Sequence, residues 1–172
     1  RFDFIATLPN DGIVTQTPEG DVLVFSRSAT ASRSLGRELG ALRAVAILEW
    51  GELLFATDQG VYLVGDDTVR PSPLAEALGG DIVTDLMSVP GPTGRYDVWI
   101  AGERGLYLWR EGELFTLRPG GLPPAAARLS FGAPIDGRPA VWVASGSWVY
   151  GLVSMDETVR AHPALNLEDR QV

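Results

Sequence analysis

Few side chains in this sequence could carry out chemistry. Histidine occurs once, at His162, and neither cysteine nor lysine occurs. These counts exclude a thiolate metal site, a cysteine nucleophile, a Schiff-base lysine and a metal site built from several histidines. A Ser-His-Asp triad would need His162, but no nucleophile-elbow motif is present. Because His162 stands beside Pro163, it is interpreted as a surface residue, and we predict no catalytic residue and no bound metal.

Acidic residues are more numerous, and two of them recur at matching turns. Asp58 and Glu103 each follow an apolar run and precede a glycine. Asp66 and Asp67 form only a pair, which is too few for a calcium loop. The sequence has no glycine-rich loop of the phosphate-binding or dinucleotide-binding type and no Asp-box pattern, so we expect no cofactor.

The elements that position these residues come from an internal repeat. Three segments align, at residues 53–63, 98–108 and 141–150, and a weaker copy opens the chain at residues 4–14. Ala56 and Ala101 lie 45 residues apart, and Ala101 and Ala144 lie 43 apart. Each copy alternates large apolar residues with small or polar ones, which predicts two strands joined by a tight turn.

Two further strands complete each repeat. The third strand is predicted at residues 68–70, 113–117 and 158–160, and a more apolar fourth strand precedes the next repeat at residues 43–48, 82–89 and 127–131. Four short strands in about 45 residues are the blade unit of a β-propeller. Helical patterns are nearly absent, apart from residues 73–78, closed by Gly79 and Gly80, and a second candidate at residues 34–42.

The predicted fold is therefore all-β, with about four blades of four antiparallel strands in a single propeller segment. The blade repeats run roughly over residues 1–42, 43–80, 81–124 and 125–165, and residues 166–172 are interpreted as the start of a further blade. The first blade is expected to lack its innermost strand. An open arc exposes apolar blade flanks, so we expect missing blades, or pairing of two chains, to complete a ring, ahead of closure as four blades.

The turns between the second and third strands are predicted to share one face of a propeller, which we call the funnel face. Asp58, Glu103, Arg104 and Ser145 could converge there on one ligand. The alternative is that polar residues simply suit exposed turns. Tryptophan could add a carbohydrate-binding surface; the five residues are Trp50, Trp99, Trp109, Trp142 and Trp148. Trp99 and Trp142 occupy equivalent strand positions, which favours core packing, whereas Trp148 replaces a turn glycine and is the better binding candidate.

The segment Val98-Trp99-Ile100-Ala101-Gly102-Glu103-Arg104-Gly105-Leu106-Tyr107-Leu108-Trp109 resembles the two-component regulator propeller repeat. Residues 81–86 are similar to the inner strand that precedes it in that family. The resemblance implies an extracytoplasmic, periplasmic sensory region of a bacterial signalling protein. Propellers of that family often have seven blades, and this chain departs from them in having about four.

These features together predict a non-catalytic sensory propeller that binds a small molecule or a protein partner at the funnel face. A structural propeller for protein assembly is the alternative. A lyase similar to the streptogramin-inactivating propellers would need catalytic histidines, and only His162 is present. The net charge is −8, and the 14 arginines are scattered, so nucleic acid is not an expected partner. No apolar run is long enough to cross a bilayer, so we expect no membrane contact from this segment.

Overall fold

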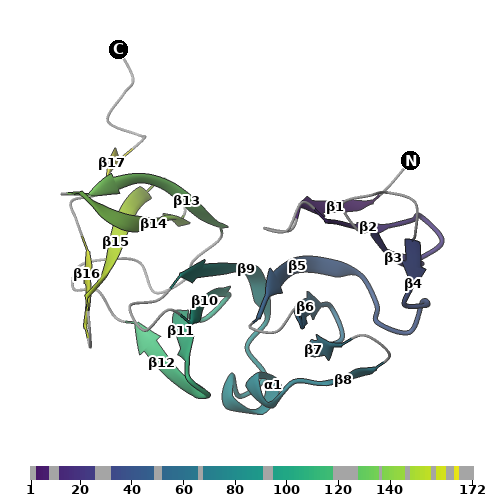
Figure 1. Cartoon of the computed structure of the whole chain (residues 1–172). Helices are drawn as coiled ribbons and strands as arrows, with labels where there is room; N and C mark the ends of the chain where they lie inside the picture. Colours follow the sequence, from purple (N-terminus) through teal and green to yellow (C-terminus); the bar gives the residue numbers. More distant parts are fainter. Residues whose placement is uncertain are drawn as a thin grey trace. The chain divides into compact units, whose positions relative to one another are not determined.

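Four β-sheets make up the described part of the chain (Figure 1). The computed structural model describes residues 3–7, 12–25, 32–48, 52–65, 68–90, 95–117, 128–135, 137–145, 148–155, 158–161 and 165–166. In each sheet, four strands that are consecutive in the sequence are hydrogen-bonded in chain order and run antiparallel. This is the arrangement of a propeller blade, so the predicted all-β propeller fold is confirmed.

The first two blades contain eight strands. The first blade consists of β1 (Phe4–Thr7), β2 (Ile13–Gln16), β3 (Val22–Phe25) and β4 (Ser32–Ser34). The second consists of β5 (Leu42–Ile47), β6 (Leu53–Thr57), β7 (Val61–Val64) and β8 (Val69–Pro71).

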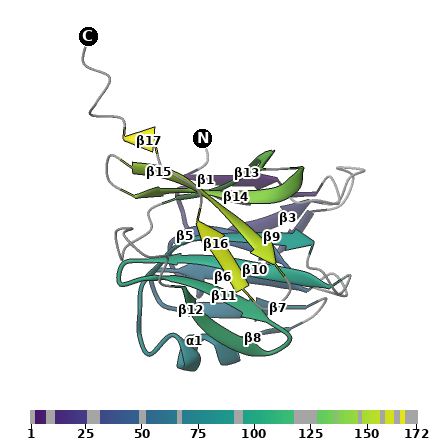
Figure 2. The same ribbon diagram turned by 90° about the vertical axis from the view of Figure 1, so that its left-hand side faces the viewer.

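The other two blades are built in the same way. The third consists of β9 (Val83–Pro90), β10 (Tyr96–Gly102), β11 (Leu106–Arg110) and β12 (Glu113–Leu117). The fourth consists of β13 (Arg128–Ile135), β14 (Arg138–Ser145), β15 (Trp148–Met155) and β16 (Thr158–Ala161). A two-residue strand, β17 (Leu165–Asn166), also pairs with β15, at the end opposite β16 (Figure 2).

The chain divides into two compact units, Arg1–Val83 and Thr84–Val172. The first two blades form one unit, here called the N-terminal pair, and the last two form the C-terminal pair. Each pair has its own apolar core, because alternate side chains of a strand point to opposite faces of its sheet and meet those of the next blade.

The core of the N-terminal pair lies between the facing sides of its two blades. Val14 and Val22 from the first blade are fully buried, and Phe55 from the second is 0% exposed. The remaining buried members of this cluster are Leu39, Leu42, Ile47, Leu53 and Val64.

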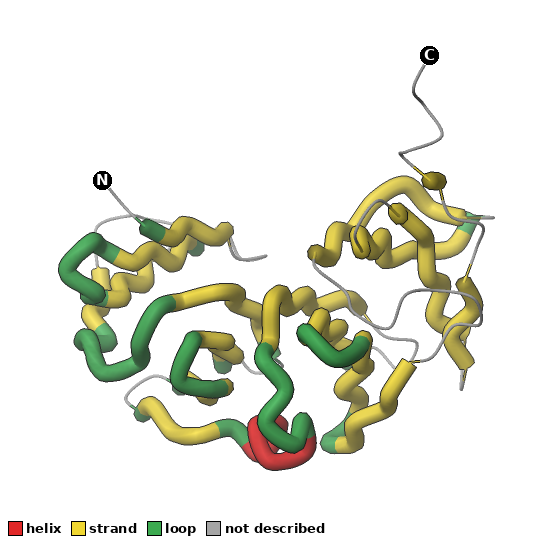
Figure 3. Tube along the Cα trace, turned by 180° about the vertical axis from the view of Figure 1, so that it is seen from behind, coloured by secondary structure: helices red, strands yellow, loops and turns green. Residues whose placement is uncertain are grey.

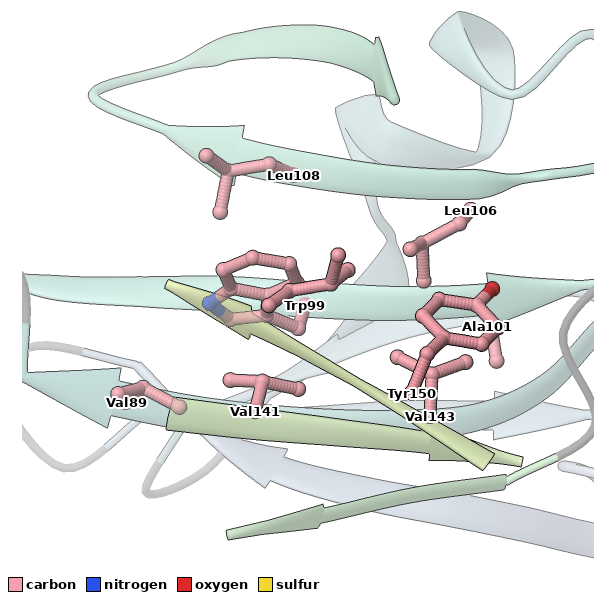
Figure 4. Close-up of a cluster of buried hydrophobic side chains, with 9 residues drawn as sticks. Val89, Trp99, Ala101, Leu106, Leu108, Val141, Val143 and Tyr150 are labelled. Atoms are coloured by element: carbon pink, nitrogen blue, oxygen red, sulfur yellow. The ribbon is translucent and has the colours of Figure 1, made fainter. Parts of the chain in front are cut away.

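The core of the C-terminal pair centres on Trp99 of β10 (Figure 4). Trp99 is 1% exposed, and in Figure 4 its indole lies between Leu108 of its own blade and Val141 of the fourth blade. Tyr150 of β15 belongs to the same cluster. The predicted core role of Trp99 is confirmed. Trp142 lies on the other face of the fourth sheet, because its neighbours Val141 and Val143 face the third blade.

Within the described residues, α1 (Pro73–Ala77) is the one helix, drawn red in Figure 3. Its N-cap is Ser72, whose side chain accepts a hydrogen bond from Leu74 N, and proline occupies the first turn. Gly79 and Gly80 follow with φ of +58° and +76°. The short helical turn predicted at residues 73–78 is confirmed.

The second predicted helix, at residues 34–42, is wrong. Ser34 ends β4, Leu42 begins β5, and the residues between them form a turn-rich connection. Gly36 and Gly40 have φ of +80° and +77°, which lies in the left-handed region and interrupts a right-handed helix. The spacing of Leu35, Leu39 and Leu42 resembles the apolar face of a helix. Leu39 instead packs into the core from the loop between β4 and β5.

One expectation about the ends of the repeat array is also corrected. The first blade does not lack its innermost strand, because β1 takes that place and β2 is the counterpart of β6. The match between residues 4–7 and 54–57 assigned residues 4–7 to the second strand of the blade, whereas they form the first. Of residues 166–172, predicted to start a further blade, Asn166 pairs with Trp148 of β15. Residues 167–172 lie outside the described residues, so the further blade stays a prediction.

Candidate functional site

The funnel end of a blade is defined here as the end where its inner strand begins and its second strand ends. In the second blade this end holds Asp58, directly after β6. The turn is closed by a hydrogen bond from Thr57 N to Gly60 O at 2.8 Å. Asp58 is exposed, and its Oδ1 accepts a hydrogen bond from Ala41 N at 2.8 Å, while Asp58 N donates to Ala41 O at 3.0 Å. The predicted ligand-binding carboxylate therefore also anchors the connection into β5.

Gly40 makes this anchor possible. Its φ is +77°, and a Cβ atom placed there would lie 2.1 Å from Asp58 Oδ1. Only glycine lets the connection pass this close to the carboxylate. Asp58 thus has a structural role that would remain even if no ligand were bound.

In the third blade the funnel end holds Glu103 and Arg104, and both are exposed. They lie on the turn from β10 to β11, which is closed by a hydrogen bond from Gly102 N to Gly105 O at 2.8 Å. Gly102 and Gly105 are buried, and a Cβ atom on Gly105 would lie 3.0 Å from the Tyr107 ring. A constrained backbone therefore carries two consecutive exposed residues of opposite charge.

In the fourth blade the corresponding turn joins Ser145, the last residue of β14, to Trp148, the first residue of β15. The two residues are register partners. Ser145 is only 6% exposed, so its hydroxyl offers less surface to a ligand than the Glu103–Arg104 turn does. The side chain of Trp148 lies outside what the structure describes.

The predicted site residues thus separate into two groups. Glu103, Arg104, Ser145 and Trp148 occupy corresponding turns of the C-terminal pair, whereas Asp58 belongs to the N-terminal pair. His162, Trp50, Asp66 and Asp67 lie outside the described residues, and Trp109 is half-buried in β11. Convergence of all five site residues on one ligand stays a prediction.

A polar bridge at the funnel end of the N-terminal pair was not predicted from the sequence. Gln16, the last residue of β2, is 5% exposed. Its Nε2 donates to Gly40 O at 2.7 Å, and its Oε1 accepts from Leu42 N at 2.9 Å. One side chain of the first blade therefore holds the start of the inner strand of the second blade. The signal was Gln16 itself, which replaces the alanine found at Ala56, Ala101 and Ala144.

The C-terminal pair has a bridge of different chemistry. Asp85 of β9 accepts hydrogen bonds from Leu86 N at Oδ1 and from Leu129 N at Oδ2, both at 2.9 Å. Arg128 donates to Thr84 O at 3.2 Å, so the two inner strands are joined twice. Burial raises the pKa of the Asp85 carboxyl, while the two backbone N–H groups and Arg128 act in the opposite direction. A charged residue inside an otherwise apolar strand was the sequence signal for this contact.

A buried ion pair also lies within the third blade, outside the predicted site. Asp97 is 3% exposed, and both of its carboxylate oxygens accept hydrogen bonds from Arg110, with 2.9 Å between Arg110 Nε and Asp97 Oδ1. The pKa of Arg110 is raised, chiefly by its hydrogen bond to Asp97. The pair is a two-point contact between adjacent strands and supports the blade.

Among the described residues, no three histidine, cysteine, aspartate or glutamate side chains gather in a way that could hold a metal ion. Within the same residues, no helix has the length and apolar content needed to span a membrane.

No family model matches the sequence, and no curated protein matches it either. Solved structures match over nearly the whole chain. The WD40 domain of SCAP from fission yeast aligns with a TM-score of 0.63 at 10% identity, over 95% of this chain and 44% of that one. The extracellular domain of a candidate hybrid two-component system from B. thetaiotaomicron has a TM-score of 0.63 at 15% identity, over 94% of this chain and 23% of that one.

A candidate gluconolactonase aligns with a TM-score of 0.61 at 13% identity, over 92% of this chain and 59% of that one. All of these structures are longer, and the chain spans less than two thirds of each. At such low identity the similarities support the propeller fold, which is shared by proteins of different functions.

Proposed function

We propose that this chain is a non-catalytic binding segment of a sensory propeller, with its recognition site at the funnel ends of its blades. The observation that carries the proposal is the Glu103–Arg104 turn. Two exposed opposite charges stand on a backbone closed by a hydrogen bond and flanked by buried glycines. A constrained loop binds with a small loss of conformational entropy, which favours recognition.

The charges of this turn define the chemistry of the ligand. A carboxylate and a guanidinium on consecutive residues of one turn suit a small polar molecule with both donors and acceptors, such as an amino acid or a sugar acid. Ser145 and Trp148 are proposed to extend the site from the corresponding turn of the fourth blade. Asp58 is proposed to contribute from the second blade, in addition to its bond to Ala41 N.

We further propose that the segment belongs to an extracytoplasmic receptor of a bacterial signalling system. The sequence resemblance to the two-component regulator propeller repeat supports this. The structural similarity to the extracellular domain of a candidate hybrid two-component system supports it as well. The neighbour related to gluconolactonase does not favour an enzyme, because its similarity reaches only the fold.

A thermal-shift panel of amino acids, sugar acids and neutral sugars tests the binding proposal. We expect at least one class to raise the melting temperature, and the double variant Glu103→Ala/Arg104→Ala to abolish that rise without changing the melting temperature of the free chain. Glu113→Ala is the matched control, because Glu113 is also exposed in the third blade but lies at the opposite end of β11. A panel without any stabilising solute, or a rise that survives the double variant, would contradict the proposal.

A second candidate function is protein recognition at the same turns. It is favoured by the similarity to a structure of YCF48 bound to D1 peptide, with a TM-score of 0.58 at 16% identity, over 91% of this chain and 51% of that one. Screening an immobilised peptide array with the chain distinguishes the two functions. Peptide binding that Glu103→Ala/Arg104→Ala removes, together with an empty small-molecule panel, would favour protein recognition.

A further inference from the structure

Tyr150 belongs to the core of the C-terminal pair, but this core leaves its hydroxyl without a partner. The side chain is 1% exposed and packs in one cluster with Trp99 and Leu106. Burial raises the pKa of the hydroxyl, so the group stays protonated and can donate a hydrogen bond at neutral pH. Among the described residues, none forms a hydrogen bond with it. Because a buried tyrosine hydroxyl usually has a hydrogen-bond partner, a partner from outside the core is expected.

The hydroxyl of Tyr150 is directed to the funnel end of the third and fourth blades. In Figure 4 its oxygen points toward Leu106, the first residue of β11. Leu106 directly follows the turn that carries Glu103 and Arg104. In the described part of the chain, Thr15 Oγ1 is the one side-chain polar atom that is fully enclosed without a partner. The Tyr150 oxygen is therefore not fully enclosed.

A guanidinium lies at the same end of these two blades. Arg128 is exposed and begins β13, and its Nη1 donates a hydrogen bond to Thr84 O of the third blade at 3.2 Å. Thr84 Oγ1 in turn donates to Ala101 O at 3.1 Å, and Ala101 is the register partner of Leu106. Arg128 and the Tyr150 hydroxyl therefore meet the same row of residues, which crosses the funnel end of the third blade from β9 to β11.

Contacts between the two inner strands hold this arrangement in place. Asp85 accepts a hydrogen bond from Leu129 N at 2.9 Å, next to the bond from Arg128 to Thr84 O. A guanidinium has several N–H groups, so Arg128 can serve a ligand while it keeps this bond. Asp85 is the acidic neighbour of Arg128, and both of its oxygens accept backbone N–H groups. An anion can therefore reach the guanidinium without displacing the bonds of Asp85.

We propose that the funnel end between the third and fourth blades binds the carboxylate of a small organic acid, with Arg128 as its ionic partner and the Tyr150 hydroxyl as a hydrogen-bond donor. Both groups donate hydrogen bonds, and a carboxylate accepts them. This inference rests on the function proposed above, because the rest of the acid contacts the Glu103–Arg104 turn beside Leu106. It narrows the ligand to a sugar acid or an amino acid rather than a neutral sugar.

Isothermal titration calorimetry with two matched pairs of solutes tests the need for a carboxylate. Glucuronate is compared with glucose, and alanine is compared with alaninamide, so that the second solute of each pair lacks the carboxylate. We expect one of the two acids to bind, and its partner without the carboxylate to bind about tenfold more weakly or worse. Glucose or alaninamide binding as tightly as its acid, or no binding by either acid, would overturn the inference.

Two variants test which side chains hold the carboxylate. Tyr150→Phe removes only the hydroxyl, and Arg128→Gln removes the charge but keeps a donor for Thr84 O. Each is expected to weaken binding of the acid by about tenfold or more and to leave binding of the solute without the carboxylate unchanged. Tyr96→Phe and Arg95→Gln are the matched controls, because Tyr96 and Arg95 are exposed at the opposite end of the third blade.

The melting temperature of the free Tyr150→Phe variant provides a test that does not depend on the solute. Since the hydroxyl has no partner in the core, its loss should not lower the melting temperature. A lower value would show that the hydroxyl already has a partner in the free chain, and would overturn the inference.

The variants also separate this inference from the function on which it rests. Acid binding that Glu103→Ala/Arg104→Ala removes, but that Tyr150→Phe and Arg128→Gln leave unchanged, would overturn the carboxylate site alone. Acid binding with the opposite dependence would support the carboxylate site and contradict the role of the Glu103–Arg104 turn.

Discussion

The N-terminal pair joins its blades through the neutral amide of Gln16, whereas the C-terminal pair uses the carboxylate of Asp85. Gln16 donates and accepts, so it serves both Gly40 O and Leu42 N. Asp85 only accepts, and it receives the N–H groups of Leu86 and Leu129. Both side chains fix the inner strand of the following blade, but only the carboxylate makes this contact dependent on protonation.

The two pairs also differ in where they place their ion pairs. The N-terminal pair has Arg37 and Asp21 in solvent, with exposed fractions of 62% and 32% for the side chains. The C-terminal pair has Arg110 and Asp97 largely buried, at 15% and 5%. Solvent therefore screens the exposed ion pair much more than the buried one.

The largest effects are expected from removing the aromatic centre of each core. Phe55→Ala and Trp99→Ala should each lower the free energy of unfolding by about 3–5 kcal/mol, because each leaves a cavity between two blades. Urea denaturation measures the loss, and hydrogen exchange locates it. Faster exchange should be confined to the N-terminal pair for Phe55→Ala and to the C-terminal pair for Trp99→Ala. The same amides opening in both variants would show that the two pairs unfold as one body.

The ion pairs provide the next contrast. Asp97→Ala should destabilise the C-terminal pair by about 3 kcal/mol, because it leaves the Arg110 guanidinium buried without a counter-charge. Asp21→Ala removes an exposed partner and should leave the urea midpoint almost unchanged. Comparable shifts of the two midpoints would show that burial does not set the importance of these pairs.

The two polar bridges should show a smaller and more even effect. Gln16→Ala leaves Leu42 N without its acceptor, and Asp85→Ala does the same to Leu129 N, so each should lower the free energy of unfolding by about 1–3 kcal/mol. Equilibrium urea denaturation measures both variants. Asp85→Asn retains one acceptor oxygen and should fall between Asp85→Ala and the wild type. A Gln16→Ala variant as stable as the wild type would show that the Gln16 bridge does not stabilise the fold.

The smallest expected effect is a difference in how the stability of the two blade pairs depends on pH. Because burial raises the folded pKa of Asp85 above 3.8, ionisation of this carboxyl lowers the stability of the folded state. The part of the stability linked to its protonation is present below 3.8 and is lost as the pH rises through the folded value, while the backbone hydrogen bonds to Asp85 remain. The folded pKa of Asp21 is lowered, mainly by its hydrogen bond to Arg37, so its contribution is present above 3.8 and is lost as the pH falls through the folded value.

Melting temperatures of Asp85→Asn and Asp21→Asn, each subtracted from the wild type over an acidic to neutral series, measure these contributions. The two difference curves should slope in opposite directions. Parallel curves would contradict the contrast between the pairs.

The repeat, the four-strand blades and the helix at Pro73–Ala77 could be predicted because they are encoded locally. Alternation of large and small residues, turn glycines and the Ser72 cap are readable along a few residues. The place of β1 in the first blade could not be predicted in this way. Residues 4–7 match residues 54–57, but a match of four residues does not show which strand of the blade they form when the buried face of β2 is unknown. A helix was wrongly predicted at residues 34–42 because Leu39 packs into the core from a loop rather than from a helix.

Of the candidate site, the sequence identified the turns but not the roles of their residues. Three of its contacts join residues that lie 17 to 44 positions apart in the sequence. They are the hydrogen bond between Asp58 and Ala41, the Gln16 bridge and the Asp85 bridge. Such contacts depend on how strands and blades pack, which a repeat pattern does not specify. Two sequence features could have indicated the polar bridges. One is the charge of Asp85 within an apolar strand, and the other is Gln16 at a position where the other repeats have alanine.

Amide chemical-shift mapping tests most directly whether the funnel ends of the blades form the binding site. The chain is titrated with the solute that gives the largest stabilisation in the thermal-shift panel, and backbone amides are followed by NMR. We predict the largest shifts at Glu103, Arg104 and the Ser145–Trp148 turn, with little change at Glu113. Shifts confined to the Glu113 end of the third blade, or to the exposed Ile5 and Ile13 of the first blade, would contradict this assignment.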